Sequence, residues 1–380
     1  MKPKLRFNDF DDEWNKVKIS SIVQESKIKT GNTEKYPLWS LTIENGVTPK
    51  TDRYERSFLV KKDDNYKIVE PNNYVYNPMN AHLGAIARNK SNTTISVSGY
   101  YDIFKINNKN YSFYDNYFVS PVMFKQYKLI STGSLLEKQR VHYSQFKELE
   151  INLPTNKEQV KISNFLSLLD KKMELQKKKI EDLKLFKLSL REELFYMFPT
   201  DNKKLSEILI KWNKKNKANK YSYVESVSNK FGFIAQNEQF EDRNVASNDT
   251  SNYYVIEKGV FAYNPSRLNV GSLALKQNDK ISLVSPLYEC FTTNQNQDFM
   301  LEWFQSKEFR RGTFSKYEGG VRNTLNFNNL SSIEINLPSI ESQNKIVKVL
   351  SCYNKLIYLE LAKLNKLQEL KRGLMQQLFV

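Results

Sequence analysis

The chain has 380 residues, of which 40% are hydrophobic and 26% are charged. This length exceeds one typical hydrophobic core and favours two or three domains. No apolar run is long enough to span a bilayer, and the amino-terminal stretch MKPKLRFNDFDDEW lacks the apolar core of a signal peptide. We therefore exclude a membrane protein and expect a cytoplasmic one.

The strongest compositional signal is a formal net charge of +16. An excess of this size favours a polyanionic partner, because cationic side chains release counterions from nucleic acid. A lysine-rich genome is the alternative explanation. Cysteine and histidine are rare (Cys290, Cys352, His82 and His142) and lack the spacing of a zinc site or a disulfide framework. We expect no metal site and two buried cysteines.

Strand-rich regions and long helical regions alternate along the chain. A long helical pattern follows Thr155, a shorter one (DFMLEWFQSKEFRRGT) starts at Asp298, and a second long one follows Pro338. The strand-like runs are rich in β-branched and aromatic residues. They are YVYNP from Tyr74, TTISVSGYYDIFKI from Thr93, VFAYNP from Val260 and ISLVSPLYECF from Ile281. Each strand-rich region is predicted to be an α+β domain.

The chain is an internal duplication. Ile151–Phe195 aligns without a gap to Ile335–Phe379, and 17 of the 45 aligned positions are identical. A second block aligns Tyr66–Phe104 with Tyr253–Phe291 through YNP, a glycine and VS in each copy. The predicted order is therefore one mixed domain and one long helix, written twice.

Each repeated helix follows a proline that ends an extended strand, with Thr155 or Ser339 as the N-cap. In the first copy, Thr155 and Glu158 have the spacing of a capping box. Apolar positions then step by four and three, which is the seam of a coiled coil. The seam residues are Ile162, Leu166, Leu169, Met173, Gln176, Ile180 and Leu183 in the first helix, and Ile346, Leu350, Ile357, Glu360, Leu364 and Leu367 in the second.

A long helix with one narrow apolar stripe needs a partner stripe, and the other copy offers one. A duplicated chain favours antiparallel pairing about a pseudo-twofold axis. This pairing places Gln176 at the level of Leu364 and Glu360 at the level of Ile180, where the two polar residues set the register. The alternative is that each helix packs only on its own domain.

Several stretches resemble the specificity (S) subunit of type I restriction–modification enzymes. They are the helix entrance LPTNKEQVKISNFLSLLD from Leu153, its copy LPSIESQNKIVKVLSCYN from Leu337, the opening RFNDFDDEW from Arg6, and the YNP, glycine and VS block in each half. The resemblance covers the whole chain. It implies two pseudo-symmetric mixed α/β target-recognition domains, separated by two long helices that form an antiparallel coiled coil. The predicted divisions are residues 1–153, 154–198, 199–337 and 338–380.

The resemblance further implies that each domain reads one half of an asymmetric bipartite DNA site. Two methyltransferase subunits and two restriction subunits are the expected protein partners. S-adenosylmethionine, ATP and Mg²⁺ are expected on those partners, and no cofactor is expected in this chain. The second copy departs from the pattern, because Ser342 replaces the glutamate at Glu158, and LLDKK at Leu168 becomes CYNKL at Cys352.

The residues themselves give no sign of catalysis. The chain has no phosphate-binding G-x-x-x-x-G-K-[ST] loop. NPM at Asn77 and NPS at Asn264 lack the second proline of an adenine-methylase NPP pocket. We expect a non-catalytic subunit that aims the catalytic ones.

Base reading requires Arg, Lys, Asn or Gln on loops that flank strands, with neighbouring cations on phosphates. The candidates are Arg88, Lys90, Lys138 and Arg140 in the first domain, and Arg267, Lys316, Arg322 and Asn323 in the second. A solvated charge or a structural ion pair is the alternative for each. Lys177–Lys179, on the rim of the coil, either contact spacer phosphates or face solvent.

Two other classes of protein stay open. One is a scaffold whose coil bridges two protein partners and whose charge is incidental; salt-sensitive, sequence-dependent DNA binding excludes it. The other is an enzyme that modifies nucleic acid by itself, which methyl transfer by the purified chain alone would establish.

Overall fold

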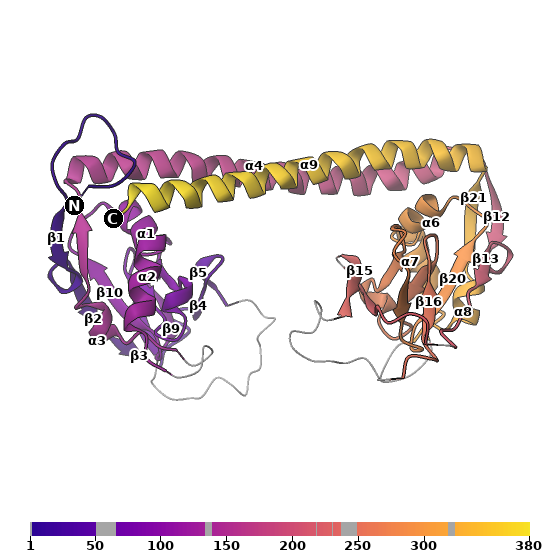
Figure 1. Cartoon of the computed structure of the whole chain (residues 1–380), viewed down its shortest axis with the longest axis horizontal. Coiled ribbons are helices and arrows are strands. Elements are labelled where there is room, and N and C mark those ends of the chain that lie inside the picture. The colour runs from indigo at the N-terminus through magenta and orange to yellow at the C-terminus, as the bar shows by residue number, and fades with distance from the viewer. Residues whose placement is uncertain are drawn as a thin grey trace. The chain divides into compact units, whose positions relative to one another are not determined.

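The computed structural model describes residues 2–50, 66–133, 139–217, 219–229, 231–236, 249–317 and 324–380. Two compact units divide the chain: unit 1 is Met1–Lys178 with Leu361–Val380, and unit 2 is Lys179–Glu360. The long helices α4 (Asn156–Tyr196) and α9 (Ile340–Leu378) each begin in one unit and end in the other (Figure 1). Each unit therefore contains a mixed α/β head and part of both helices.

The head of unit 1 is built on a four-stranded antiparallel sheet with the order β2-β10-β7-β8. Beside it lie a three-stranded sheet, β3-β6-β9, the hairpin β4-β5 and the pair β1-β11. The strands are β1 (Asn15–Lys18), β2 (Val23–Ser26), β3 (Lys29–Thr30), β4 (Trp39–Thr42), β5 (Gly46–Pro49), β6 (Tyr66–Val69), β7 (Tyr74–Tyr76), β8 (Ile86–Arg88), β9 (Ile95–Ser98), β10 (Asp102–Ile106) and β11 (Glu150–Leu153). The helices are α1 (Tyr111–Tyr117), α2 (Pro121–Ile130) and α3 (Tyr143–Phe146).

The head of unit 2 repeats this arrangement, with the sheet order β13-β20-β17-β18, the hairpin β14-β15 and the pair β12-β21. Its strands are β12 (Thr200–Lys204), β13 (Leu209–Lys211), β14 (Glu225–Ser228), β15 (Gly232–Ala235), β16 (Tyr254–Ile256), β17 (Phe261–Tyr263), β18 (Leu273–Leu275), β19 (Ser282–Val284), β20 (Glu289–Thr293) and β21 (Glu334–Pro338). Its helices are α6 (Gln297–Trp303), α7 (Lys307–Phe314) and α8 (Phe327–Ser331). The predicted duplication and the α+β class are confirmed.

The repeated sequence motifs have a structural cause in both heads. The tyrosine of YNP ends a central strand, and Tyr76 and Tyr263 are fully buried there. The glycine that follows, Gly84 or Gly271, closes a 3₁₀ turn with φ of 99° or 91°. Only glycine adopts this left-handed conformation without strain, which explains why it stands in both copies.

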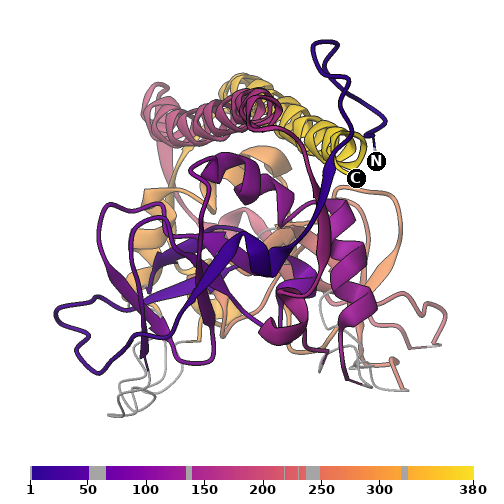
Figure 2. The same ribbon diagram turned by 90° about the vertical axis from the view of Figure 1, so that its left-hand side faces the viewer.

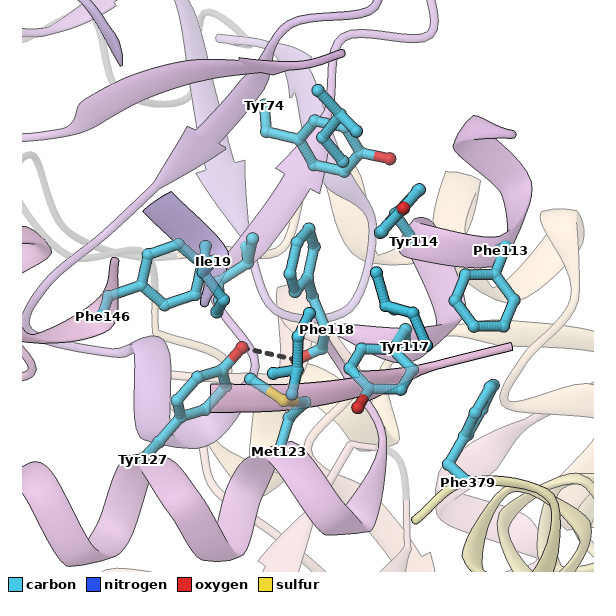
Figure 3. Packing of buried hydrophobic residues seen from close by; sticks show 14 of the residues in the cluster. Ile19, Tyr74, Phe113, Tyr114, Tyr117, Phe118, Met123, Tyr127, Phe146 and Phe379 are labelled. Atoms are coloured by element: carbon cyan, nitrogen blue, oxygen red, sulfur yellow. Dashed lines mark hydrogen bonds between the residues drawn. The ribbon is translucent and has the colours of Figure 1, made fainter. Parts of the chain in front are cut away.

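Each head packs its aromatic core against the long helices. In unit 1, Phe379, the residue after α9, lies edge-on to Phe113 and Tyr117 of α1, with ring centroids 5.7 and 5.3 Å apart (Figure 3). In unit 2, Phe195 of α4 meets Phe299 of α6 in the same way at 5.3 Å. Phe195 and Phe379 are one of the aligned sequence pairs, so the duplication extends to the core.

The first seam residues of each long helix belong to the head cores, because Ile162 and Leu166 pack in unit 1 and Ile346 and Leu350 pack in unit 2. The helices then pair with each other. This finding combines the two alternatives that the sequence left open: each helix packs on a head near both of its ends and on the other helix between them.

The helix pairing is antiparallel, as predicted. In unit 1, Lys371 Nζ of α9 lies 2.7 Å from Asp170 Oδ1 of α4. In unit 2, Lys179 Nζ lies 2.9 Å from Glu360 Oε1. The ring centroids of Phe186 and Tyr353 are 5.4 Å apart. Residue numbers on α9 therefore fall as those on α4 rise, and each of the predicted seam residues is buried or half-buried.

Two expectations from the sequence are wrong in detail. Cys290 is buried, but Cys352 is exposed on α9, because it lies outside the seam. Thr155 Oγ1 accepts a hydrogen bond from Glu158 N at 3.4 Å, as an N-cap does. The Glu158 carboxylate, however, pairs with a distant arginine and does not complete a capping box. Within the described residues, no helix is long and apolar enough to cross a membrane.

Candidate nucleic-acid interface

A buried glutamine joins each head to its long helix. In unit 1, Gln159 Nε2 donates to the Pro154 carbonyl at 3.0 Å, and its Oε1 accepts from Asn110 Nδ2 at 3.2 Å. In unit 2, Gln343 Nε2 donates to the Pro338 carbonyl at 2.8 Å. Its Oε1 accepts from the backbone of Asn296, the N-cap of α6, at 3.0 Å. A buried amide costs free energy unless it is hydrogen-bonded, so this residue fixes where the helix enters the head.

The amino-terminal segment closes one end of unit 1. Arg6 makes two hydrogen bonds of 2.8 Å to the Glu158 carboxylate, whose side chain is 1% exposed. Phe7 packs edge-on against Phe165 at 5.9 Å, and Leu5 N donates to the Gln377 carbonyl of α9 at 3.1 Å. Figure 2, in which unit 1 faces the viewer, shows the N-terminal segment beside the end of α9. Glu158, at the start of α4, thus pairs with Arg6, which lies far away in the sequence.

Arg88, the first predicted DNA contact, is engaged within the head. Its Nη2 lies 2.9 Å from Asp115 Oδ2, its Nη1 donates to Asn72 at 2.6 Å, and its guanidinium lies over the Tyr111 ring at 5.2 Å. Tyr74 also donates to Asp115, at 2.8 Å, and burial raises the pKa of Tyr74 well above its ordinary value, so it stays a neutral donor. The geometry supports the structural alternative for Arg88, which ties β8 to α1.

Lys90 has the opposite character, because its side chain is 70% exposed while its Nζ lies 3.3 Å from Asp115. Asp115 is shared with Arg88, so the group of three keeps a net positive charge. An exposed lysine of this kind can turn toward a phosphate without leaving a buried charge unpaired.

Two of the other predicted contacts, Arg140 and Arg267, lie at the YNP turns. Val141 N donates to the Pro78 carbonyl at 2.9 Å, and Leu325 N donates to the Pro265 carbonyl at 3.1 Å. In each head, these bonds tie the loop before α3 or α8 to the turn that follows β7 or β17. We call these surfaces the turn–loop surfaces, residues 77–80 with 131–133 and 139–141 in unit 1, and residues 264–267 with 315–317 and 324–325 in unit 2.

Three of the predicted cations lie on the turn–loop surfaces. Arg140 and Arg267 are exposed on them, and Lys316 is half-buried, with its carbonyl accepting from Asn329 Nδ2 at 3.0 Å. Lys138, Arg322 and Asn323 lie outside the described residues. The structure therefore brings Arg140 and Arg267 to equivalent surfaces, and the DNA-binding roles of all these residues stay predictions.

Unit 2 carries a cationic cluster that the sequence analysis missed. Lys215 Nζ lies 3.2 Å from the centroid of the Tyr254 ring, and Lys280 Nζ lies 3.2 Å from that of Tyr223. Lys220 adds a cation 5.5 Å from the ring of its neighbour Tyr221. The signal was present in the run KWNKKNKANKYSY from Lys211, which interleaves lysines with aromatic residues as nucleic-acid-binding surfaces do. We call this group the lysine–tyrosine cluster.

The helix pair leaves apolar side chains uncovered. Outside the seam, α9 carries a second stripe at spacings of three and four residues: Val349, Cys352, Leu356 and Leu359. All four are exposed. The aligned positions on α4 include Leu168 and Leu175, which are 68% and 59% exposed. Lys179, predicted on the coil rim, is 55% exposed and paired with Glu360. A continuous exposed apolar stripe marks a protein-interaction surface.

Two copies of one head, each with cationic turns and loops, joined to two long paired helices, define a two-headed nucleic-acid-recognition scaffold. Among the described residues, no group of three or more His, Cys, Asp or Glu side chains is placed to hold a metal ion.

Comparison with known proteins gives the family. The chain matches the type I restriction modification DNA specificity domain twice, over residues 11–185 and 199–371. It therefore belongs to the family of type I restriction–modification specificity subunits. Members of this family recognise DNA and are not catalytic, so this chain is a recognition subunit and not an enzyme.

Solved structures share the fold across the whole chain. The type I restriction–modification S subunit from M. genitalium aligns with a TM-score of 0.51 and 15% identity, covering 100% of this chain and 99% of that one. A chain from a structure of complex assembly and conformational transition of the type I R-M system aligns with a TM-score of 0.59 and 12% identity, covering 97% and 98%. No curated protein matches the sequence.

Proposed function

We propose that the two heads read the two halves of an asymmetric bipartite DNA site. The observation that carries this proposal is the duplication itself: one head architecture occurs twice, with the same core and different surfaces. Repetition of the core maintains the fold, while a difference in surface changes what each head recognises. Contacts to phosphates then set the register on the duplex, and polar side chains on the loops distinguish the bases.

The cations differ between the heads in the way that two different half-sites require. Unit 1 presents Lys90 near Asp115 and Arg140 on its turn–loop surface. Unit 2 presents Arg267 on its turn–loop surface and adds the lysine–tyrosine cluster. The two cationic surfaces are therefore not copies of each other, although the strands beneath them are.

The helix pair sets the spacing between the half-sites in this proposal, because α4 and α9 are each shared by both units. The exposed stripe of α9 and the exposed leucines of α4 are the surfaces on which two methyltransferase subunits dock. The complex described for one structural relative, a type I R-M system that assembles and changes conformation, supports this part. Two restriction subunits complete the proposed assembly, which we place in the cytoplasm.

Catalysis belongs to the partners in this scheme. The methyltransferase subunits bind S-adenosylmethionine and methylate adenine, and the restriction subunits use ATP and Mg²⁺ to translocate and cleave DNA. This chain supplies the sequence specificity, because it holds the partners at the DNA sequences that its heads recognise.

Co-expression with methyltransferase and restriction subunits, followed by single-molecule mapping of methylated adenines in host DNA, tests the proposal. We expect a split, asymmetric motif. Exchanging residues 66–133 for the same region of a relative with another specificity is expected to change one half of the motif and leave the other unchanged. An assembled complex that methylates no defined sequence would contradict the proposal and favour a protein-bridging scaffold.

A further inference from the structure

The hairpin β14-β15 of unit 2 presents an aromatic side chain to solvent at its tip. Phe231 lies in the turn between the two strands and is 75% exposed. Gly232 closes this turn with a φ of 69°, a conformation that a residue with a side chain rarely adopts. The ring therefore has no packing role in the head, and its removal leaves the core unchanged.

The strands behind Phe231 are held on several sides. Val227 N donates to the Tyr288 hydroxyl at 3.2 Å, and the Val227 carbonyl accepts from Ser272 Oγ at 3.3 Å. Asn229 Nδ2 donates to the Val270 carbonyl at 3.3 Å. These bonds fasten the hairpin to β18, to the 3₁₀ turn at Leu268–Val270 and to the turn between β19 and β20.

An ion pair in the interior adds a further restraint. Lys276 Nζ pairs with the Glu225 carboxylate at the start of β14, and their side chains are 0% and 4% exposed. Burying two charges is costly, so such a pair is retained where it defines one geometry. The equivalent position in unit 1 holds a neutral residue, Asn89, which bonds to backbone carbonyls. The buried ion pair is therefore a restraint of the unit 2 hairpin that this position of unit 1 does not supply.

The counterpart hairpin has a different tip. In unit 1 the turn between β4 and β5 reads Ile43-Glu44-Asn45-Gly46, with Gly46 at a φ of 66°. Asn45 aligns with Phe231, and Glu44 places a carboxylate there that phosphates repel. The fold thus tolerates a polar residue at this position. Phe231 belongs to the surface chemistry of unit 2 alone.

The lysine–tyrosine cluster lies at the other end of the same strand. Tyr223, whose ring lies against Lys280 Nζ, is two residues before the start of β14. Five extended steps of ~3.3 Å place it ~16 Å from Ser228, the last residue of β14. The minor groove, from which apolar wedges enter a base step, is ~6 Å wide, so cations at one end of the strand can hold a phosphate while the tip reaches the bases. Leu287, 75% exposed on the turn that bears Tyr288, adds a second apolar side chain near the hairpin.

We propose that Phe231 stacks against one base step of the half-site that unit 2 reads, with the pinned hairpin as its rigid support. An apolar wedge of this kind unstacks a step and makes recognition depend on how readily that step deforms. The inference rests on the function proposed above and assigns a residue to it.

The test uses the complex of this chain with its methyltransferase partner, and it starts from the motif mapped for the wild type. Duplexes that carry the motif, with 2-aminopurine at successive positions of the second half-site, report unstacking by fluorescence. Binding is measured in parallel by anisotropy on the cognate duplex and on a scrambled one. The variants are Phe231→Ala, Phe231→Trp and, as a matched exposed aromatic of unit 2 on α4, Tyr196→Ala.

We expect Phe231→Ala to weaken cognate binding by at least ~10-fold, as loss of a base–aromatic stack does. Binding to the scrambled duplex is expected to stay unchanged. One 2-aminopurine position brightens with the wild type, Phe231→Trp and Tyr196→Ala, and stays dark with Phe231→Ala.

Two results would overturn the inference: wild-type cognate affinity in Phe231→Ala, or a loss of affinity with no fluorescent position in the wild type. Both leave the proposed function standing, because the mapped motif already establishes it. A wild-type complex without any motif would refute the proposed function first, and the inference with it.

Discussion

The same lysine of the repeated helix has different partners in the two units. In unit 1, Lys371 of α9 pairs with Asp170 across the coil, and the carboxylate is 45% exposed. In unit 2, the aligned Lys187 of α4 pairs at 2.6 Å with Glu302 of the head, and their side chains are 13% and 10% exposed. Asn354 replaces the aspartate in unit 2 and donates to Glu302 at 3.3 Å.

The carboxylate that pairs with this lysine lies on the partner helix in unit 1 and on the head in unit 2. This difference accounts for the missing aspartate in the second copy. CYNKL has asparagine where LLDKK has aspartate, and in unit 2 the lysine pairs with Glu302 instead. Glu302 also lies 3.6 Å from Arg191 of α4, whose side chain is 4% exposed. The head and helix of unit 2 are therefore joined by a buried ionic group, whereas the aligned residue in unit 1, Met375, packs in the apolar core.

The starts of α4 and α9 also differ in a charged residue according to the partner that is available. Glu158 is present in the first copy because Arg6 of the amino-terminal segment reaches it. In the second copy, Ser342 has only the N-cap hydroxyl of Ser339, 3.1 Å away, as its side-chain partner among the described residues. The copy of the repeated motif that has a charged residue is thus the one in which an oppositely charged partner lies nearby in the fold.

The largest predicted effect comes from Glu302→Gln, which leaves the buried Lys187 without its carboxylate and leaves Arg191 with Glu192, 3.5 Å away, as its ionic partner. We expect a loss of about 4 kcal/mol in the local stability of unit 2, because removing one partner of a buried ion pair costs 3–5 kcal/mol. Hydrogen exchange of α6 in the full chain measures it. Asp170→Asn is the matched change in unit 1, and there a loss of less than about 1 kcal/mol is expected, because that pair is exposed. Equal losses would contradict the comparison.

The next largest effect is expected for Glu158→Ala, which removes the carboxylate partner of Arg6. The Arg6 side chain is 12% exposed. We expect a loss of about 3 kcal/mol in unit 1, seen as faster exchange at the start of α4. Ser342→Ala at the aligned position of unit 2 is the control, with an expected change of about 0.5 kcal/mol or less. A destabilised Ser342→Ala variant would show that the second entrance has a partner of its own.

Arg88 and Lys90 separate structure from DNA contact within one head. Arg88→Ala is expected to lower the stability of unit 1 by about 2 kcal/mol, because Asp115 loses its principal partner. Lys90→Ala is expected to leave stability unchanged and to reduce the slope of log K against log salt by about 0.9, one phosphate contact. Denaturation and DNA titration across a salt series distinguish the two. An unchanged salt slope would remove Lys90 from the interface.

The smallest effect concerns pH. Hydrogen bonding to Lys18 and Lys16 lowers the pKa of Glu148 and Glu150 beside the β1-β11 pair. A carboxylate with a lowered folded-state pKa contributes stability above its unfolded-state pKa, and this contribution is lost as pH falls through the folded-state value. We expect exchange at β1-β11 to accelerate below about pH 4.3. Glu148→Gln with Glu150→Gln should abolish that dependence.

Most of the fold is predictable from the periodicity of the hydrophobic residues, because a seam residue is identified by its neighbours three and four positions away. The helices, their antiparallel pairing and the duplicated heads follow from such local patterns. Partners far apart in sequence were not predictable: Arg6 and Glu158 are separated by 152 positions, and nothing near either one indicates the other. The same limit applied to Arg88, whose engagement with Asp115 appears only in three dimensions.

Exposure was also hard to predict for residues that are rare and small. Cys352 was expected to be buried because free cysteine usually is, but it lies on the second stripe of α9. The lysine–tyrosine cluster, by contrast, has a local signal in the sequence, because the run from Lys211 interleaves lysines with aromatic residues.

Cys352 makes the natural sequence suitable for spectroscopy. The chain has only two cysteines, and Cys290 is 1% exposed with a pKa raised by burial, so its thiol is a poor nucleophile. A maleimide dye will therefore attach at Cys352 alone, without engineering. Because the label lies among Val349, Leu356 and Leu359, we expect its emission to change when a subunit docks on this stripe as proposed above.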